Sequence, residues 1–200
     1  MKPLVMDGLL TLGDRSRWCL MSPDGLYRYA LGATWDAEPV EAWEPTRPIF
    51  AVTMKNPSKA THDVDDTTWL KVVHFAKQEG CGGVLVRNLA AWRATEPRDL
   101  AECRDPIGPR NAEVLALEPF FALRVAAWGA FESETIRRRL GPSVPAARAS
   151  CNLVLGLTKD GHPKHPCRLA HSTRVVSWED ARRIAAAIRR GAPTITTKEP

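Results

Sequence analysis

Four short apolar runs, separated by segments long enough to hold a helix, constrain the fold of this chain more than any other feature of its sequence. Continuous apolar runs of this length are typical of strands that are buried on both faces of a sheet. Strands connected by helices pair in parallel through right-handed crossovers. The sequence therefore predicts an α/β fold, a three-layer α/β/α sandwich around a mainly parallel central sheet of about four strands. The expected strands are 49–54, 83–87, 123–128 and 152–157.

Capping residues and stop signals mark the helices that accompany these strands. Asp65 or Asp66 is expected to begin a helix that runs to about Gln78, where a group of glycines ends it. A last helix is expected after Ser177, which has Asp180 at the capping-box position. The remaining expected helices cover 111–121 and 132–140.

The first 48 residues differ in pattern from the rest of the chain. Residues 20–29 contain a Pro-Asp-Gly turn between two strand-like segments, which predicts a β-hairpin. Residues 35–48 are rich in Glu and Pro and are expected to form an extended connector. We expect a single compact domain, in which 1–48 form the hairpin and connector and 49–200 form the α/β/α part.

Composition narrows the classes of protein to which the chain can belong. No apolar stretch approaches the roughly 20 residues needed to cross a bilayer, so a membrane protein is not expected. The five cysteines form no C-x-x-C pair, which is typical of reduced thiols and predicts a cytoplasmic protein. We expect no cofactor and a monomer. The formal net charge of +5 permits nucleic-acid binding without establishing it.

Polar residues follow the expected strands, at the edge where an α/β sheet carries its functional cleft. Asn56 follows the first strand directly, and its amide can hold and orient a water molecule through the carbonyl oxygen. Its alternative role is that of an ordinary Asn-Pro turn. Asn88 ends the second strand and presents a donor and an acceptor together, which suits the edge of a nucleobase. Trp92 can stack on a base or fill the core.

Two histidines lie in the loop after the last expected strand. His162 and His165 each precede a proline and stand among Lys159 and Lys164. An imidazole at this edge can donate a hydrogen bond to an oxygen that gains negative charge as a bond breaks. The sequence does not decide which of the two histidines has this role.

Three carboxylates, those of Asp63, Asp65 and Asp66, lie close together in the sequence. Close carboxylates can hold Mg²⁺, as in nucleases and other phosphoryl-transfer enzymes. Negative charge at a helix start also stabilises the helix, and capping is the simpler interpretation of these residues.

Several segments together resemble a bacterial and phage family of uncharacterised domains, over about residues 20–178. Membership in that family implies no particular activity. The segments that carry the resemblance are Asn56-Pro57-Ser58, Asp63-Val64-Asp65-Asp66, Arg87-Asn88-Leu89, Asp105-Pro106-Ile107-Gly108-Pro109, Ala126-Ala127-Trp128-Gly129 and 156–166.

The order of elements is also similar to that of the uracil-DNA glycosylase superfamily. The resemblance implies that Asn56 handles the attacking water, that Asn88 reads the flipped base, and that His162 or His165 stabilises the departing base. Trp128-Gly129 closes the third strand in the same order. The final loop reads His-Pro-Lys-His-Pro where that superfamily has His-Pro-Ser, and the first loop lacks the usual glycine and aromatic residue. A modified or damaged base therefore fits as well as uracil.

These observations predict a DNA-acting hydrolase that cleaves the N-glycosidic bond of a modified or damaged base without metal, on duplex or single-stranded DNA. One alternative is a Mg²⁺-dependent nuclease or phosphoesterase built on the three aspartates. The other is a non-catalytic nucleic-acid-binding module that uses its arginine-rich helices. Besides the catalytic candidates, the expected base contacts are Asn88, Trp92 and Ser58, and the expected backbone contacts are Lys55, Arg93, Lys159 and Lys164.

Overall fold

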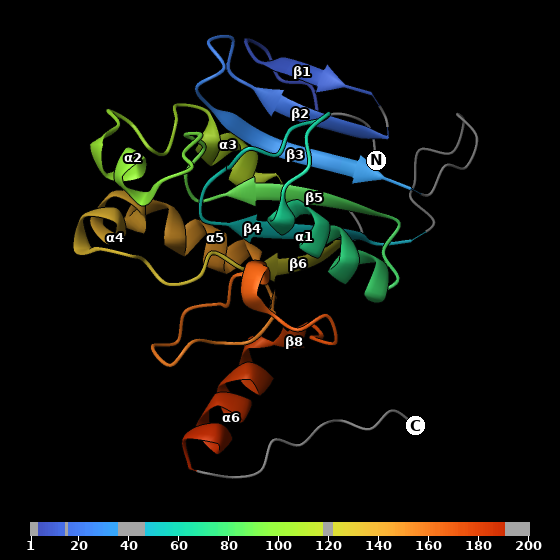
Figure 1. Cartoon of the computed structure of the whole chain (residues 1–200), viewed down its shortest axis with the longest axis vertical. Coiled ribbons are helices and arrows are strands. Elements are labelled where there is room, and N and C mark those ends of the chain that lie inside the picture. The colour runs from blue at the N-terminus through green and yellow to red at the C-terminus, as the bar shows by residue number, and fades with distance from the viewer. Residues whose placement is uncertain (1–3, 15, 36–46, 118–121, 191–200) are drawn as a thin grey trace.

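A computed structural model describes residues 4–14, 16–35, 47–117 and 122–190 of the chain. The described strands form one open, mixed sheet in the order β1-β2-β3-β5-β4-β6-β7-β8 (Figure 1). The strands are β1 (Leu10–Gly13), β2 (Arg17–Met21), β3 (Arg28–Thr34), β4 (Ile49–Met54), β5 (Gly83–Asn88), β6 (Ala122–Ala126), β7 (Leu153–Val154) and β8 (Val176–Ser177). The helices are α1 (Thr67–Gln78), α2 (Pro97–Glu102), α3 (Asn111–Ala116), α4 (Glu134–Leu140), α5 (Val144–Ser150) and α6 (Trp178–Arg189), with 3₁₀ turns η1 (Gly141–Ser143) and η2 (Pro166–Arg168).

The sheet is larger and more mixed than the sequence indicated. Strands β5, β4, β6 and β7 are neighbours and run parallel, in the part of the chain where four strands were expected. Strands β1 to β3 extend the sheet beyond β5, and β8 extends it beyond β7, all by antiparallel pairing. Among the described strands, four of the seven neighbouring pairs are antiparallel, so the expectation of a mainly parallel sheet of about four strands is corrected.

The N-terminal hairpin is part of this sheet. Strands β2 and β3 pair around a turn at Ser22–Gly25, in which the Gly25 amide donates to the Ser22 carbonyl at 2.9 Å. Strand β3 then pairs along its length with β5, which would otherwise be an exposed sheet edge. Most of the connector expected over 35–48 lies outside the described residues.

Side chains alternate between two cores on the two faces of the sheet, as the pleat of a strand requires. On β4, Phe50, Val52 and Met54 pack in the same cluster as Trp69 and Phe75 of α1. Residues Ile49 and Ala51, which alternate with them, belong to a second cluster with Val114 of α3. Helices therefore contact both faces of the sheet, and Figure 1 shows α1 in front of it.

The helix starts follow their capping residues. Asp66 caps α1, with its side chain accepting from the Trp69 amide at 2.7 Å. Ser177 caps α6 by accepting from the Asp180 amide at 3.0 Å. Helix α3 ends at Ala116, before the predicted end at residue 121, and 118–121 lie outside the described residues. The two short helices α2 and α5 were not predicted. None of the described helices is both long and apolar enough to cross a membrane.

Candidate functional site

The strand order reverses at β4, which has β5 on one side and β6 on the other. In α/β sheets the crevice at the carboxyl ends of strands at such a reversal is the usual place for a ligand. A hollow of about 660 Å³ opens here, a size within the range of ligand pockets. We call it the large hollow, and its walls come from the loops after β4, β6 and β7.

A second hollow of about 160 Å³ adjoins the first one. Its walls include Arg28, Ser58, Asp66 and the indole of Trp69, over an apolar floor from β3, β4 and β5. We call it the small hollow. Asn56 and His165 line both hollows, so these two side chains stand where the hollows meet.

Asn56 is held at the end of β4 by the loop that follows β5. The amide of Ala90 donates to the carbonyl of Lys55, and the amide of Ala94 donates to the carbonyl of Pro57, so the two loops run together. The Asn56 Nδ2 group donates to Pro57 O at 3.0 Å and to Ala94 O at 2.9 Å. Both amide hydrogens are therefore engaged, and Oδ1 is the atom that remains to accept a hydrogen bond.

His165 comes from the loop on the other side, at the start of η2. Its Nδ1 accepts a hydrogen bond from the Cys167 amide at 3.3 Å, so a neutral ring carries its proton on Nε2. Nε2 has no hydrogen-bond partner within the described ranges. The loop is joined to the end of β6, where the amide of Gly129 donates to Pro163 O at 2.8 Å. Gly129 has a φ of +74°, and a Cβ there would stand 3.3 Å from the Cβ of His165, so a glycine suits this close approach.

The environment of His165 keeps its ring neutral. Burial, reinforced by the positive charge of Lys55, lowers the pKa of His165 to about 4. The carboxylates of Asp66 and Glu132 act in the opposite direction and only partly offset these effects. At neutral pH the imidazole is therefore an uncharged hydrogen-bond donor through Nε2.

We expect an NMR titration of the His165 ring to give a midpoint near 4, whereas a histidine in an unfolded chain titrates near 6.5. Because folding depresses the pKa, protonation of the ring favours the unfolded chain. Above pH 6.5 the ring is neutral in both states, and its contribution to the stability of the folded protein is fully present. That contribution is lost as the pH falls toward 4. The ¹H and ¹⁵N shifts of the ring, recorded between pH 3 and 8, measure this directly. A midpoint at or above 6 contradicts the environment described for the ring.

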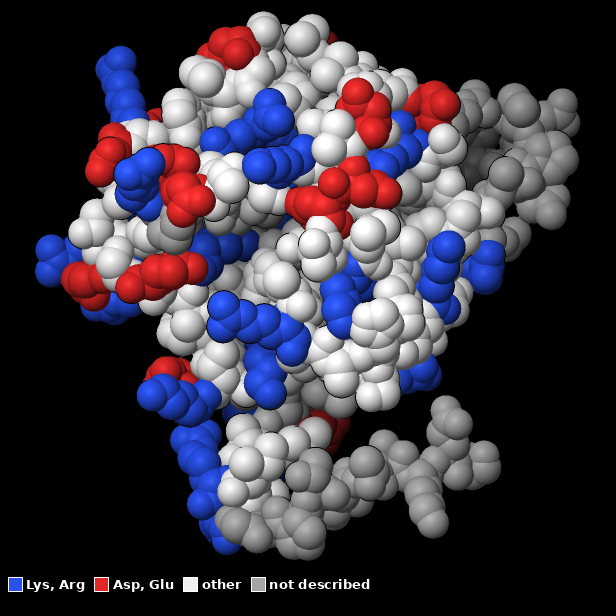
Figure 2. Space-filling model, in the orientation of Figure 1, with Lys and Arg blue, Asp and Glu red and all other residues white. Residues whose placement is uncertain are grey.

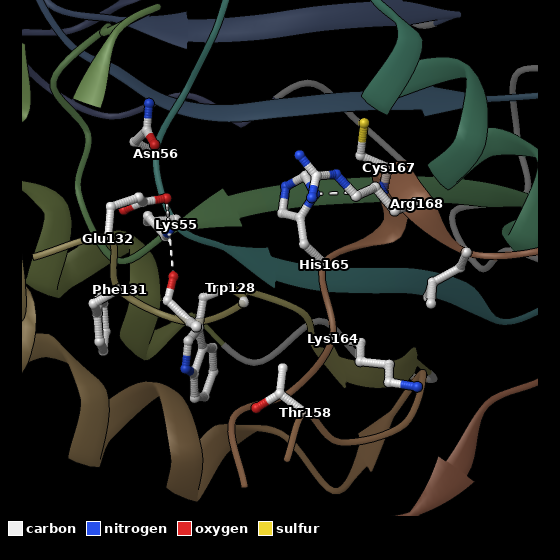
Figure 3. Close-up of a pocket in the computed structure, with 13 residues that line it drawn as sticks. Lys55, Asn56, Trp128, Phe131, Glu132, Thr158, Lys164, His165, Cys167 and Arg168 are labelled. Atoms are coloured by element: carbon white, nitrogen blue, oxygen red, sulfur yellow. Dashed lines mark hydrogen bonds and ion pairs between the residues drawn. The ribbon is translucent and has the colours of Figure 1, made fainter. Parts of the chain in front are cut away.

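An ion pair lies on the wall that faces the histidine. Lys55 is 9% exposed as a residue, and its ammonium donates to Ala130 O at 2.6 Å and pairs with the carboxylate of Glu132. In Figure 3 this pair and Asn56 lie to one side, and His165 and Arg168 lie to the other. Because Lys55 already has a carboxylate partner, Lys164 and Arg168 add positive charge to the large hollow. Sequence reasoning missed Glu132 and Arg168, which no motif marks.

His162 does not line either hollow, although it contacts Phe131 and Thr158, which line the large one. Its ring packs edge-on against Phe131, with ring centroids 5.6 Å apart, and its backbone closes a turn with Thr158. Of the two candidate histidines, only His165 therefore lines the site. Lys159 is exposed in that same turn and lines neither hollow.

Asn88 also lies apart from the hollows. It is the last residue of β5 and is fully buried, and neither polar atom of its side chain has a hydrogen-bond partner. Its backbone carbonyl accepts from Asn111 Nδ2 at 3.0 Å. The expected contact of Asn88 with a base therefore has no geometric support in this structure.

Trp92 and Arg93 line a separate hollow of about 280 Å³, together with Ser58. The indole of Trp92 packs edge-on against Tyr27, with ring centroids 5.4 Å apart, as a residue with a packing role does. Ser58 lines this hollow and the small one, and its hydroxyl donates to the carboxylate of Asp66. Of the expected base contacts, Ser58 alone lies beside Asn56 and His165 in a hollow.

The three aspartates do not form a cluster. Asp66 caps α1, Asp65 pairs with Arg17, and Asp63 accepts from the hydroxyl of Thr61. Within the described ranges, no group of three or more His, Cys, Asp or Glu residues is arranged to hold a metal ion. The capping interpretation explains Asp66, and the magnesium alternative lacks a set of ligands.

Comparison with known proteins gives one finding. A family model described as "Protein of unknown function (DUF1643)" matches residues 28–167, which is more than half of the chain. The matched region runs from the start of β3 to η2 and so includes both Asn56 and His165. No curated protein and no solved structure gave a match.

Proposed function

We propose that this chain, which belongs to the DUF1643 family of proteins of unknown function, hydrolyses the N-glycosidic bond of a modified or damaged nucleotide in DNA. The observation that carries the proposal is the meeting of Asn56 and His165 at the boundary of the two hollows. Each side chain has one polar atom engaged by the backbone and one polar atom left for a ligand.

The first step is departure of the base. The C1′–N bond breaks and its electron pair leaves with the base, which therefore gains negative charge. A neutral imidazole that donates through Nε2 stabilises an oxygen of that base as the charge develops. Because the pKa of His165 is about 4, the ring has no charge to lose between pH 6 and 8. It acts as a fixed hydrogen-bond donor, and the departing base takes its proton from solvent.

The second step is addition of water. The Oδ1 atom of Asn56 accepts a hydrogen bond from a water molecule and directs its oxygen to C1′. An amide is a poor base, so the water cannot be deprotonated before it attacks. Bond breaking must therefore run ahead of bond making, and the water loses its proton to solvent as the new C1′–O bond forms. This order makes the reaction depend on stabilisation of the departing base.

The two hollows offer different surroundings to the two parts of a nucleotide. The small hollow has an apolar floor and an indole wall, which suit a planar ring. The large hollow is open and is lined by Lys164 and Arg168, which suit the flanking phosphates. On the face drawn in Figure 2, lysine and arginine side chains occur in both halves, whereas most acidic side chains lie in the upper half, so the lower half is mainly basic.

The test is incubation of the full chain with oligonucleotides that carry a range of deaminated, oxidised or substituted bases, as single strands and as duplexes. Abasic sites are scored by strand cleavage in hot alkali, with and without EDTA. We expect abasic sites on at least one substrate and the same rate with EDTA present. Strand breaks that EDTA abolishes would instead favour the magnesium alternative. Salt-sensitive binding without abasic sites would favour a binding module.

A further inference from the structure

A buried guanidinium forms part of the wall of the small hollow. Arg28 lies at the start of β3 and is 2% exposed. Its Nη1 donates to the carbonyl of Ala60. The side chain has no other hydrogen-bond acceptor among the described residues. Its Nε is buried and has no partner. Most of the five N–H donors of this guanidinium therefore have no partner among the described residues, and the side chain that carries them lines the small hollow.

Such a group is costly to keep inside a protein. Burying a charged donor without partners is unfavourable, and an apolar residue of similar volume at such a position is often as stable or more stable. Burial lowers the pKa of Arg28 to about 10, although the carboxylate of Asp66 opposes the shift, so the side chain is still charged at neutral pH. The carboxylate of Asp66 offsets part of this cost, and a ligand in the hollow that accepts from the guanidinium would offset more of it.

The geometry of the hollow limits what that ligand can be. A guanidinium presents its donors as a rigid fork, which matches two acceptors lying side by side. The walls beside it are the indole of Trp69 and the apolar floor of Leu31, Met54 and Val86, which suit a planar ring. Asp66 accepts from the Ser58 hydroxyl and from the Trp69 amide, and no hydrogen bond or ion pair joins it to Arg28 within the described residues.

We propose that Arg28 determines specificity at this site by selecting a base whose inner edge carries two adjacent hydrogen-bond acceptors. An oxo group beside an unprotonated ring nitrogen provides such an edge, and so does a carboxylate substituent. A base with an amino group on that edge places a donor against the guanidinium and is rejected. This inference rests on the proposed function, because it takes the ring in the small hollow to be the departing base.

The experiment measures binding of free bases by ligand-observed NMR at millimolar concentration. Hypoxanthine is compared with adenine, and 5-carboxyuracil with uracil, so that each pair differs mainly in the edge offered to Arg28. The variants are R28M, which removes the donors, and R28K, which keeps the charge without the fork. The matched control is R17M, because Arg17 stacks on Trp69 at 4.6 Å and pairs with Asp65 but does not line the small hollow.

We expect wild type and R17M to prefer one of the two acceptor-bearing bases over its partner by about tenfold or more. Preference within the purine pair identifies the oxo–nitrogen edge, and preference within the pyrimidine pair identifies the carboxylate. R28K, and R28M where it folds, should bind both members of that pair equally. Equal binding by wild type, no binding of any of the four bases, or a preference that survives in R28K overturns the proposal.

These outcomes are separate from those of the hydrolysis test. Selective binding that depends on Arg28, without any release of bases from DNA, would leave the role of Arg28 intact and contradict hydrolysis. Release of bases at the same relative rates by wild type and R28K would support hydrolysis and contradict the role of Arg28.

Discussion

Replacing His165 with alanine is expected to slow base release by at least about 100-fold, which is the usual effect of removing one donor that stabilises a developing negative charge. The ring meets the requirements for this role, because its Nδ1 is engaged by the Cys167 amide and its pKa is about 4. Single-turnover rates on the best substrate measure the effect on the chemical step separately from binding.

The chain supplies its own control for this variant. His162 lies three residues away and lines neither hollow itself, although its ring packs against Phe131 of the large hollow, so H162A is expected to keep a rate within about threefold of wild type. H165Q retains an N–H donor and is expected to recover part of the lost rate. Equal effects of H162A and H165A, or an unchanged rate in H165A, would mean that the imidazole of His165 does not stabilise the departing base.

Replacing Asn56 with alanine is expected to produce a loss of similar size, about 100-fold, through loss of the acceptor that directs the water. The substitution also removes two hydrogen bonds to the backbone, to Pro57 O and Ala94 O. Some loss of stability is therefore expected, at about 1 kcal/mol for each bond. The rate is measured well below the unfolding temperature of the variant, which calorimetry gives.

A second variant separates the chemical role of Asn56 from its structural one. N56D keeps an oxygen that can accept from water but loses the donors to Pro57 O and Ala94 O. If Asn56 directs water, N56D is expected to be less stable than wild type and faster than N56A. If Asn56 serves only to hold the two loops together, N56D and N56A lose activity in proportion to their loss of stability.

The positions of several elements could be predicted because the signals for them are local. The apolar runs mark β4 and β5 almost to the residue, since a strand buried on both faces is mostly apolar. Asp66 and Ser177 mark the starts of α1 and α6, because each can satisfy its own helix end. The loops of Asn56 and His165 follow from these positions.

Other features could not be predicted because they depend on contacts between distant parts of the chain. The pairing of β3 with β5 joins segments about 50 residues apart, and no local pattern reports it. Asn88 was expected to face the cleft, but β5 continues through this residue and buries its side chain. A shift of one residue at a strand end moves a side chain to the other face, so a motif alone cannot decide its direction.

The sequence by itself determined which strands end in polar loops, and hence that an amide and a histidine would come from strand ends at the same edge of the sheet. Only the tertiary structure decided that the histidine is His165 and that Arg28 reaches the same hollow from β3. The physical reason is that backbone preference and apolar pattern act over a few residues. The direction, burial and pKa of a side chain depend instead on neighbours that folding brings from elsewhere in the chain.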